Sequence, residues 1–124
     1  MVRTKNDPAK LPGHGDCGQF LRPIRDTLDI ISGKWKVPII AALMFGKKRF
    51  KEMERSIPKI TARMLSKELT QLEDNQLITR KVYDTKPVTV EYELTPYGKS
   101  LDKVMMEMKL WGEQHRTRIM GKNK

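Results

Sequence analysis

The stretch "TARMLSKELTQLEDNQLITRKVYDTKPVTVEYEL", residues 61–94, changes its apolar period halfway along. Up to Leu72 the apolar residues recur three or four positions apart, as on one face of a helix. From Ile78 the period is two, as in strands, and the turn-forming residues 84–87 divide this part into two runs. The stretch therefore predicts a helix over 61–75, capped by Thr61, and a β-hairpin over 78–94.

The flanking sequence predicts more helices. Upstream, Pro23 fits the first turn of a helix that ends at residues 32–33, and two shorter helices follow over 36–45 and 49–57. Downstream, Thr95 and Pro96 begin a long helix predicted over 96–119. Residues 1–22 are expected to form a flexible arm and residues 120–124 a disordered tail.

The predicted order of elements defines the fold class. Helices followed by a two-stranded hairpin and a last long helix give a mainly α protein with a small β-hairpin wing (α+β). This is the layout of a winged helix-turn-helix, in which the second helix of a pair enters the major groove of DNA. The pair here is 49–57 and 61–75, within one domain over 23–119.

The charge of the chain is concentrated in one segment. The net charge is +10 and the pI is about 9.9. Residues 46–67 hold eight Lys or Arg side chains against two Glu, and this segment ends inside the predicted helix 61–75. Such a concentration favours binding of a polyanion, with nucleic acid ahead of an anionic membrane. No run of about 18 apolar residues is present, so the sequence predicts no membrane span.

The exposed side of helix 61–75 supplies the candidate DNA-binding residues. Arginine donors and short polar side chains can read base edges in the major groove, whereas lysines suit phosphates. Among these residues, Arg63, Ser66 and Thr70 are the strongest candidates for sequence reading. The full predicted set is Lys48, Arg49, Lys59, Thr61, Ala62, Arg63, Ser66, Lys67, Thr70 and Gln71, with Lys86 at the wing tip.

The last predicted helix carries an apolar seam. Its members alternate at spacings of four and three: Tyr97, Leu101, Val104, Met108, Trp111 and His115. A helix of about 24 residues spans about 36 Å, more than a small domain needs to cover itself. We therefore expect the seam to pack against a second copy of the chain, although packing on its own domain is the alternative.

Several of these segments match a known family in the same order. They are "GKWKVPIIAALMFGKKRFKEMERSIPKITARMLSKELTQLE", "LITRKVY", "VEYELTPYGKSL" and "LWGEQH", which lie between Pro23 and about His115. The sequence resembles the HxlR-type bacterial transcriptional regulators, which are relatives of the MarR winged-helix group. The resemblance implies a homodimer joined through its first and last helices and bound to a palindromic operator. The implied interface contains Ile24, Leu28, Leu101, Val104, Met108 and Trp111.

The sequence departs from the family pattern at three positions. Gln76 stands where relatives commonly have Gly at the exit of the reading helix, and Asn75 is expected to take the left-handed conformation instead. Thr89 stands at a wing position that is often Arg. Arg22 stands where several relatives have a sensing Cys before the proline that opens the first helix.

These observations predict a DNA-binding transcriptional regulator that acts as a homodimer in the cytoplasm, at the nucleoid. The alternative is a winged-helix module that binds protein or RNA. Cys17, with His14 three residues before it, is the candidate redox sensor, and a single cysteine excludes an intrachain disulfide. No catalytic, metal-binding or cofactor-binding motif is found, so no enzyme activity or cofactor is expected. Regulation by a small-molecule effector is the alternative to a redox signal, and the sequence does not identify that effector. No secretory signal is found.

Overall fold

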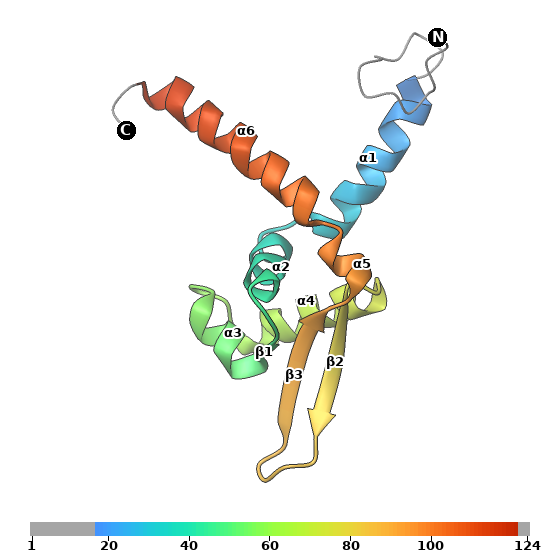
Figure 1. Ribbon diagram of the computed structural model, residues 1–124, viewed down its shortest axis with the longest axis vertical. Helices are drawn as coiled ribbons and strands as arrows, with labels where there is room; N and C mark the ends of the chain where they lie inside the picture. Colours follow the sequence, from blue (N-terminus) through green and yellow to red (C-terminus); the bar gives the residue numbers. More distant parts are fainter. Residues whose placement is uncertain (1–16, 122–124) are drawn as a thin grey trace. The chain divides into compact units, whose positions relative to one another are not determined.

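A computed structural model of the protein describes residues 17–121 (Figure 1). The chain divides into two compact units, the first ending at Gly33 and the second beginning at Lys34. The described part of the first unit is helix α1, Cys17–Ile31. It begins six residues before Pro23, so residues 17–22 of the predicted arm are helical, and the rest of that arm lies outside the described residues.

Pro23 therefore lies inside α1 and does not open it. Proline lacks a backbone N–H and normally weakens a helix interior. Leu21 extends the apolar stripe of Ile24 and Leu28 upstream at helical spacing, which favours continuation of the helix through the proline. The Thr27 hydroxyl donates a hydrogen bond of 2.9 Å to the Pro23 carbonyl.

The second unit has the predicted fold class, mainly helical with a small sheet (Figure 1). Its three strands are antiparallel in the order β1-β3-β2, with the short strand β1 completing what was predicted as a two-stranded hairpin. A strand of two residues is too short to produce an alternating sequence pattern. The elements are α2 (Lys36–Met44), β1 (Lys48–Arg49), α3 (Phe50–Ser56), α4 (Ala62–Asp74), β2 (Ile78–Tyr83), β3 (Thr89–Leu94), α5 (Pro96–Lys99) and α6 (Asp102–Met120).

The core of this unit fixes the rotation of α4 about its axis. Leu65, Leu69 and Leu72 on one side of α4 are fully buried. Each buried leucine contributes about 1.5–3 kcal/mol, so turning the helix would cost several kcal/mol. The opposite side of α4 is thereby held toward solvent. The other core residues of this unit come from α2, α3, the sheet and the segments on either side of α4: Ile39, Ile40, Leu43, Met53, Ile57, Ile60, Leu77, Ile78, Tyr92 and Leu94.

Helix α4 ends in a Schellman motif built on Gln76. The Leu77 N–H bonds to the Leu72 carbonyl at 3.0 Å, and the Gln76 N–H bonds to the Glu73 carbonyl at 2.9 Å. This motif places its left-handed residue one position after the C-cap, which here is Gln76 with a φ of 65°. The expectation that Asn75 would take this conformation was wrong, because Asn75 is the C-cap itself with a φ of −87°.

The start of α5 is attached to the exit of α4. The Thr95 hydroxyl donates to the Gln76 carbonyl at 2.8 Å and accepts from the Gly98 N–H at 2.8 Å. The Thr95 N–H bonds to the Leu77 carbonyl at 3.0 Å. Gly98 packs so closely here that a Cβ atom would lie 2.1 Å from the Leu77 carbonyl oxygen. One small residue therefore sets how α5 sits on the end of α4.

The single helix predicted over 96–119 is two helices. At the junction the Ser100 and Leu101 N–H groups bond to the carbonyls of Tyr97 and Gly98, three residues back, at 3.1 Å each. The Ser100 hydroxyl also bonds to the Tyr97 carbonyl, and such side-chain competition disturbs the regular helical ladder. Helix α6 then runs to Met120 with no buried residue. Among the described helices, none has the length and apolarity that crossing a membrane requires.

Candidate nucleic-acid interface

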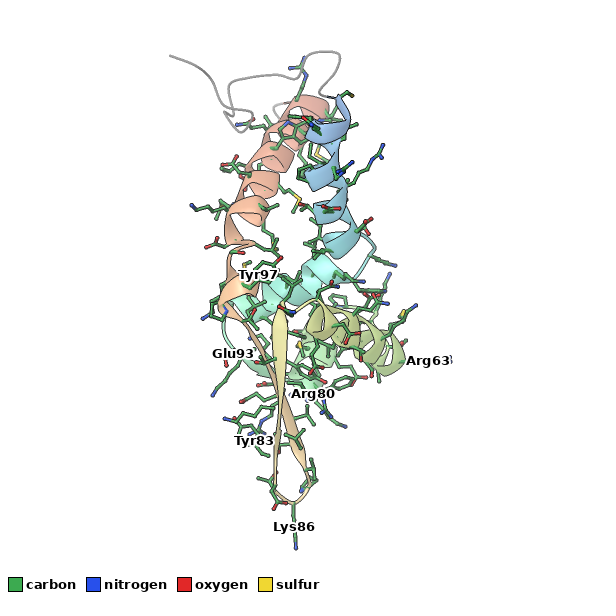
Figure 2. All side chains as sticks on the ribbon, turned by 90° about the vertical axis from the view of Figure 1, so that its right-hand side faces the viewer. Arg63, Arg80, Tyr83, Lys86, Glu93 and Tyr97 are labelled. Atoms are coloured by element: carbon green, nitrogen blue, oxygen red, sulfur yellow. The ribbon has the colours of Figure 1, made fainter. Side chains whose placement is uncertain are left out.

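The outward side of α4 carries most of the predicted DNA-binding residues. Thr61 caps the helix, and its side-chain oxygen accepts from the Met64 N–H at 3.1 Å. Arg63 projects outward from α4 in Figure 2. All of the following are exposed: Thr61, Ala62, Arg63, Ser66, Lys67 and Thr70. The structure thus gathers these six residues on one face.

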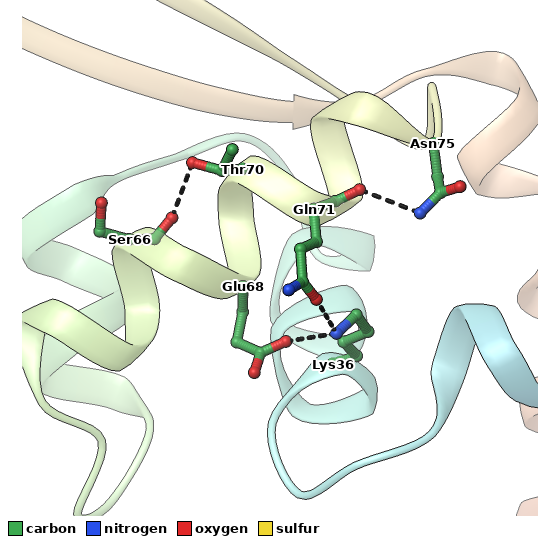
Figure 3. Close-up of polar contacts among 6 residues, drawn as sticks. All are labelled: Lys36, Ser66, Glu68, Thr70, Gln71 and Asn75. Carbon is green, nitrogen blue, oxygen red and sulfur yellow. Dashed lines mark hydrogen bonds and ion pairs between the residues drawn. The ribbon is translucent and has the colours of Figure 1, made fainter.

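The cationic side chains of this face are available to a ligand. Neither Arg63 nor Lys67 forms an ion pair with any residue that the structure describes. The Thr70 hydroxyl donates to the Ser66 carbonyl at 3.0 Å (Figure 3), so its oxygen remains free to accept. The face therefore offers charged donors together with short polar groups, a combination that suits base edges and phosphates.

Gln71 does not belong to this face, which corrects the prediction made for it. Its side-chain oxygen accepts a hydrogen bond of 2.5 Å from the Lys36 ammonium (Figure 3). The same ammonium pairs with the Glu68 carboxylate at 2.5 Å, and the two charged side chains are only 11% and 17% exposed. Lys36 at the start of α2 thus binds the inner side of α4 and neutralises Glu68. No periodic pattern in the sequence indicates that a lysine at this position faces inward.

The predicted phosphate contacts lie on three different elements. Lys48 is half-buried on β1, opposite Tyr92, whereas Arg49 is exposed and lies opposite Glu91 on the other face of the sheet. The Arg49 N–H bonds to the Glu52 carboxylate at 2.7 Å, which fixes the start of α3. Lys59 is exposed in the turn between α3 and α4, with a φ of 70°.

On the outer face of the sheet, the Glu91 carboxylate is already bound by neighbouring side chains. The Tyr83 hydroxyl donates to the Glu91 carboxylate at 2.7 Å, and the Lys47 ammonium lies 3.6 Å from the same carboxylate. The hydrogen bond from Tyr83 lowers the pKa of Glu91, and Lys47 and Arg49 lower it further. The same hydrogen bond raises the pKa of Tyr83. Arg49 therefore shares its surroundings with an acid, unlike Arg63.

The tip of the wing carries Lys86, which is exposed (Figure 2). Thr89, which stands where relatives often have Arg, lies beside it without a charge. Its hydroxyl is 3.0 Å from that of Thr85, so the two threonines close the tip of the hairpin. Lys86 is then the cation that this end of the wing presents to a ligand.

Arg80 on β2 is a cationic residue of this surface that the sequence analysis missed. It alternates with Ile78 and Val82, so it occupies a position of the apolar side of the strand. An arginine within an otherwise apolar alternation was the available signal. Figure 2 shows Arg80 on the side of the wing toward α4 and Arg63, and Tyr83 and Glu93 on the opposite side.

The predicted dimer residues are exposed or half-buried in their own units. In α1, Ile24 and Leu28 are exposed. In the second unit Leu101 is half-buried, and Val104, Met108 and Trp111 are exposed. The Trp111 ring is 66% exposed and stacks on His115, with 5.0 Å between the ring centroids. An apolar seam this open favours a partner helix.

Cys17, the candidate redox sensor, is the first residue of α1 and carries an exposed free thiol. His14, which the sequence places near it, lies outside the described residues. The role of Cys17 as a redox sensor therefore stays a prediction.

Comparison with known proteins agrees with this geometry. Residues 30–120 match the family model of the HxlR-like helix-turn-helix. A relative from Bacillus subtilis (strain 168), the HTH-type transcriptional regulator YdeP, is 48% identical over 97 residues, covering 78% of this chain and 76% of YdeP.

Solved structures give the same result. The redox regulator HypR in its reduced form has a TM-score of 0.74 and 43% identity, over 79% of this chain and 97% of HypR. The reduced form of the transcriptional regulator YodB from B. subtilis has a TM-score of 0.69 and 38% identity, over 75% of this chain and 91% of YodB. The protein therefore belongs to the HxlR-like helix-turn-helix family of transcriptional regulators.

Proposed function

We propose that this protein acts as a homodimer on a palindromic operator, with α4 of each copy in the major groove and each wing tip at the adjacent minor groove. The observation that carries the proposal is the outward face of α4. Its cations, Arg63 and Lys67, have no acidic partner among the described residues, while Glu68 on the same helix is turned inward and paired with Lys36. The face is thus kept positive and polar.

The roles divide according to chemistry. The guanidinium of Arg63 suits a guanine edge, and Ser66 and Thr70 suit neighbouring bases. Lys48, Lys59 and Lys67 suit phosphates, which fix register without reading sequence. Arg49 is the weaker phosphate contact, because it lies on the same face as Glu91. Two copies would place their reading helices about 34 Å apart, in successive major grooves.

Binding of the upstream DNA of its own gene tests the proposal. Fluorescence anisotropy at moderate salt should show at least tenfold preference for that DNA over random duplex. Arg63→Ala should reduce this preference, whereas Lys67→Ala should weaken both complexes alike. Lys103→Ala, which removes an exposed charge from α6, is the control and should change neither. Equal affinity of the wild type for the two duplexes would favour the alternative, a module for RNA or protein.

The relatives HypR and YodB make a redox response of Cys17 worth testing, since HypR is named as a redox regulator. An intersubunit disulfide would require one Cys17 thiol from each copy and an oxidant such as a peroxide. Cys17→Ser should then abolish release of DNA by that oxidant. Release that is unchanged in this variant would eliminate the thiol mechanism. Acting on chromosomal DNA, such a regulator would work in the cytoplasm at the nucleoid.

A further inference from the structure

Along the two strands of the hairpin, the inner face contains one charge, that of Arg80, and Lys48 on β1 lies on the same face of the sheet, opposite Tyr92. Arg80 pairs with Tyr92 in the β2–β3 ladder, and the neighbouring pair on the same face is Ile78 with Leu94. Ile78, Tyr92 and Leu94 are buried in the core. One step further from the core, Val82 is 51% exposed, and Val88 at the tip is 62% exposed. Arg80 therefore lies where the sheet leaves the core and becomes a free wing.

The Arg80 guanidinium has no acidic partner among residues 17–121. It forms no ion pair with any residue in the described part of the chain. The two carboxylates of the adjacent strand, Glu91 and Glu93, alternate with Tyr92 and so lie on the other face of the sheet. Glu91 is in addition held by Tyr83 and Lys47. An exposed arginine on an apolar face, without a carboxylate, is open to an external anion.

We propose that Arg80 binds the phosphate of the DNA strand that passes between α4 and the wing. This inference rests on the proposed function. A protein with a helix in the major groove and a hairpin at the next minor groove must straddle the sugar-phosphate backbone that separates the two grooves. Arg80 lies on the wing side of that gap and Arg63 on the helix side (Figure 2). A guanidinium fork is well suited to two phosphate oxygens.

A second explanation for Arg80 is protection of the sheet edge. Strand β2 is an edge strand, since the strand order is β1-β3-β2. A charge on the inner side of an edge strand discourages pairing with another chain. This explanation predicts that removing Arg80 promotes aggregation and leaves DNA binding unchanged, so the two roles make different predictions.

The neighbouring Lys81 provides a matched control. It carries the same charge one residue away, but its side chain lies on the outer face, with its ammonium 5.3 Å from the centroid of the Tyr83 ring. Arg80→Ala should lower affinity about tenfold for operator and random duplex alike. It should also reduce the slope of log K against log salt concentration by about 1.8, since the dimer carries two copies of Arg80 and each phosphate contact contributes about 0.9. Lys81→Ala should change affinity less than twofold.

Equal effects of Arg80→Ala and Lys81→Ala on affinity and slope would overturn the proposal, as would aggregation of Arg80→Ala with unchanged DNA affinity. If Arg80→Ala does not fold, Arg80→Gln is combined with operators that carry one neutral methylphosphonate at a time. The proposal requires one position at which the methylphosphonate weakens binding of the wild type but does not weaken binding of Arg80→Gln, each compared with the unmodified operator. Absence of such a position refutes the proposal. Failure of the wild type to bind any duplex would instead refute the proposed function.

Discussion

Gln76 adopts a backbone conformation that is unfavourable for a residue with a Cβ atom. Its φ of 65° lies in the left-handed region, which costs a residue with a Cβ about 1–2 kcal/mol. The Schellman bonds of Leu77 and Gln76 require this conformation, and the burial of Leu72 and Leu77 on either side holds it. Its side chain is exposed, so no packing contact compensates for the strain.

Gln76→Gly should therefore stabilise the protein by about 1 kcal/mol, because glycine adopts this conformation without a steric penalty. For a protein of this size, thermal unfolding followed by circular dichroism should show a rise in Tm of several degrees. Asn75→Gly is the control. Asn75 has a negative φ and donates a side-chain hydrogen bond to the Gln71 carbonyl, so its replacement should give no gain.

The Tyr83–Glu91 pair makes a pH-dependent contribution with a definite sign. The pKa of Glu91 is lowered in the folded protein, so its contribution is present above the ordinary value of 4.5 and is lost as pH falls through the folded pKa. The pKa of Tyr83 is raised from 10.0, so its contribution is present below that value and is lost as pH rises through the folded pKa. Between these two limits neither group titrates.

Tyr83→Phe should move the pKa of Glu91 up toward 4.5, because the hydrogen bond is the main cause of its depression. The carboxyl chemical shift of Glu91, followed by NMR from pH 6 to pH 2, measures this directly. Thr79→Val, which alters the same face without touching Glu91, should leave that pKa unchanged. A Glu91 titration that is identical in wild type and Tyr83→Phe would mean that the hydrogen bond is absent in solution.

At the scale of elements, periodicity predicted α4 and the wing because both have one buried side. The three leucines of α4 repeat at helical spacing, and the strand pairs Ile78–Leu94, Arg80–Tyr92 and Val82–Val90 repeat at every second residue. Sequence patterning could not find β1, which has two residues, or the inward turn of Lys36, whose partners lie on α4. Both depend on contacts between residues far apart in the chain.

The break between α5 and α6 was missed for a related reason. Pro96, the apolar seam and good helix-forming residues all favour one continuous helix. The tightened turn forms beside the Ser100 hydroxyl bond and where Gly98 lies against the Leu77 carbonyl, a contact between residues separated in sequence by the whole hairpin. The local sequence around residues 96–102 does not predict such a contact.

Gly98→Ala should destabilise the protein by more than 2 kcal/mol, because the new methyl group would overlap the Leu77 carbonyl oxygen and the backbone would have to move. Urea unfolding should show the loss as a lower midpoint. Gly112→Ala is a matched control in α6. No atom lies within 4 Å of the position of its Cβ, so alanine should there stabilise the helix by about 0.5–1 kcal/mol.

At the scale of the whole molecule, charge and apolar surface are separated. The basic segment 46–67 contains α3 and the start of α4, whereas the exposed apolar seam lies mainly on α6. The first surface suits a polyanion, and the second suits a helix from another copy. The family was predictable from sequence because its motifs keep their order along the chain. Which polar side chains of α4 are exposed was not predictable, because a pattern cannot distinguish Gln71, which is bound to Lys36, from Thr70, which is exposed.

The dimer proposal makes a prediction at this scale. Trp111→Glu should convert the dimer to a monomer, because it places a charge in the centre of the seam where a partner would exclude water. Sedimentation velocity at micromolar concentration measures the change. Lys109→Glu, on the same helix but outside the seam, should remain dimeric. A wild type that sediments as a monomer at the concentrations that bind operator would contradict the proposal.

Because the start of α5 is attached to the end of α4, a small rotation at this attachment becomes a large displacement at the far end of α6. Helix α6 has 19 residues and is therefore about 28 Å long. A tilt of about 10° about the junction at Gly98 displaces its far end by about 5 Å, roughly one helical turn. Leu77, next to this junction, moves little, but its N–H closes the exit of α4 by bonding to the Leu72 carbonyl, and its carbonyl accepts from the Thr95 N–H. A small change of angle at the exit of α4 thus corresponds to a large displacement of the far end of α6, the helix on which two copies would meet.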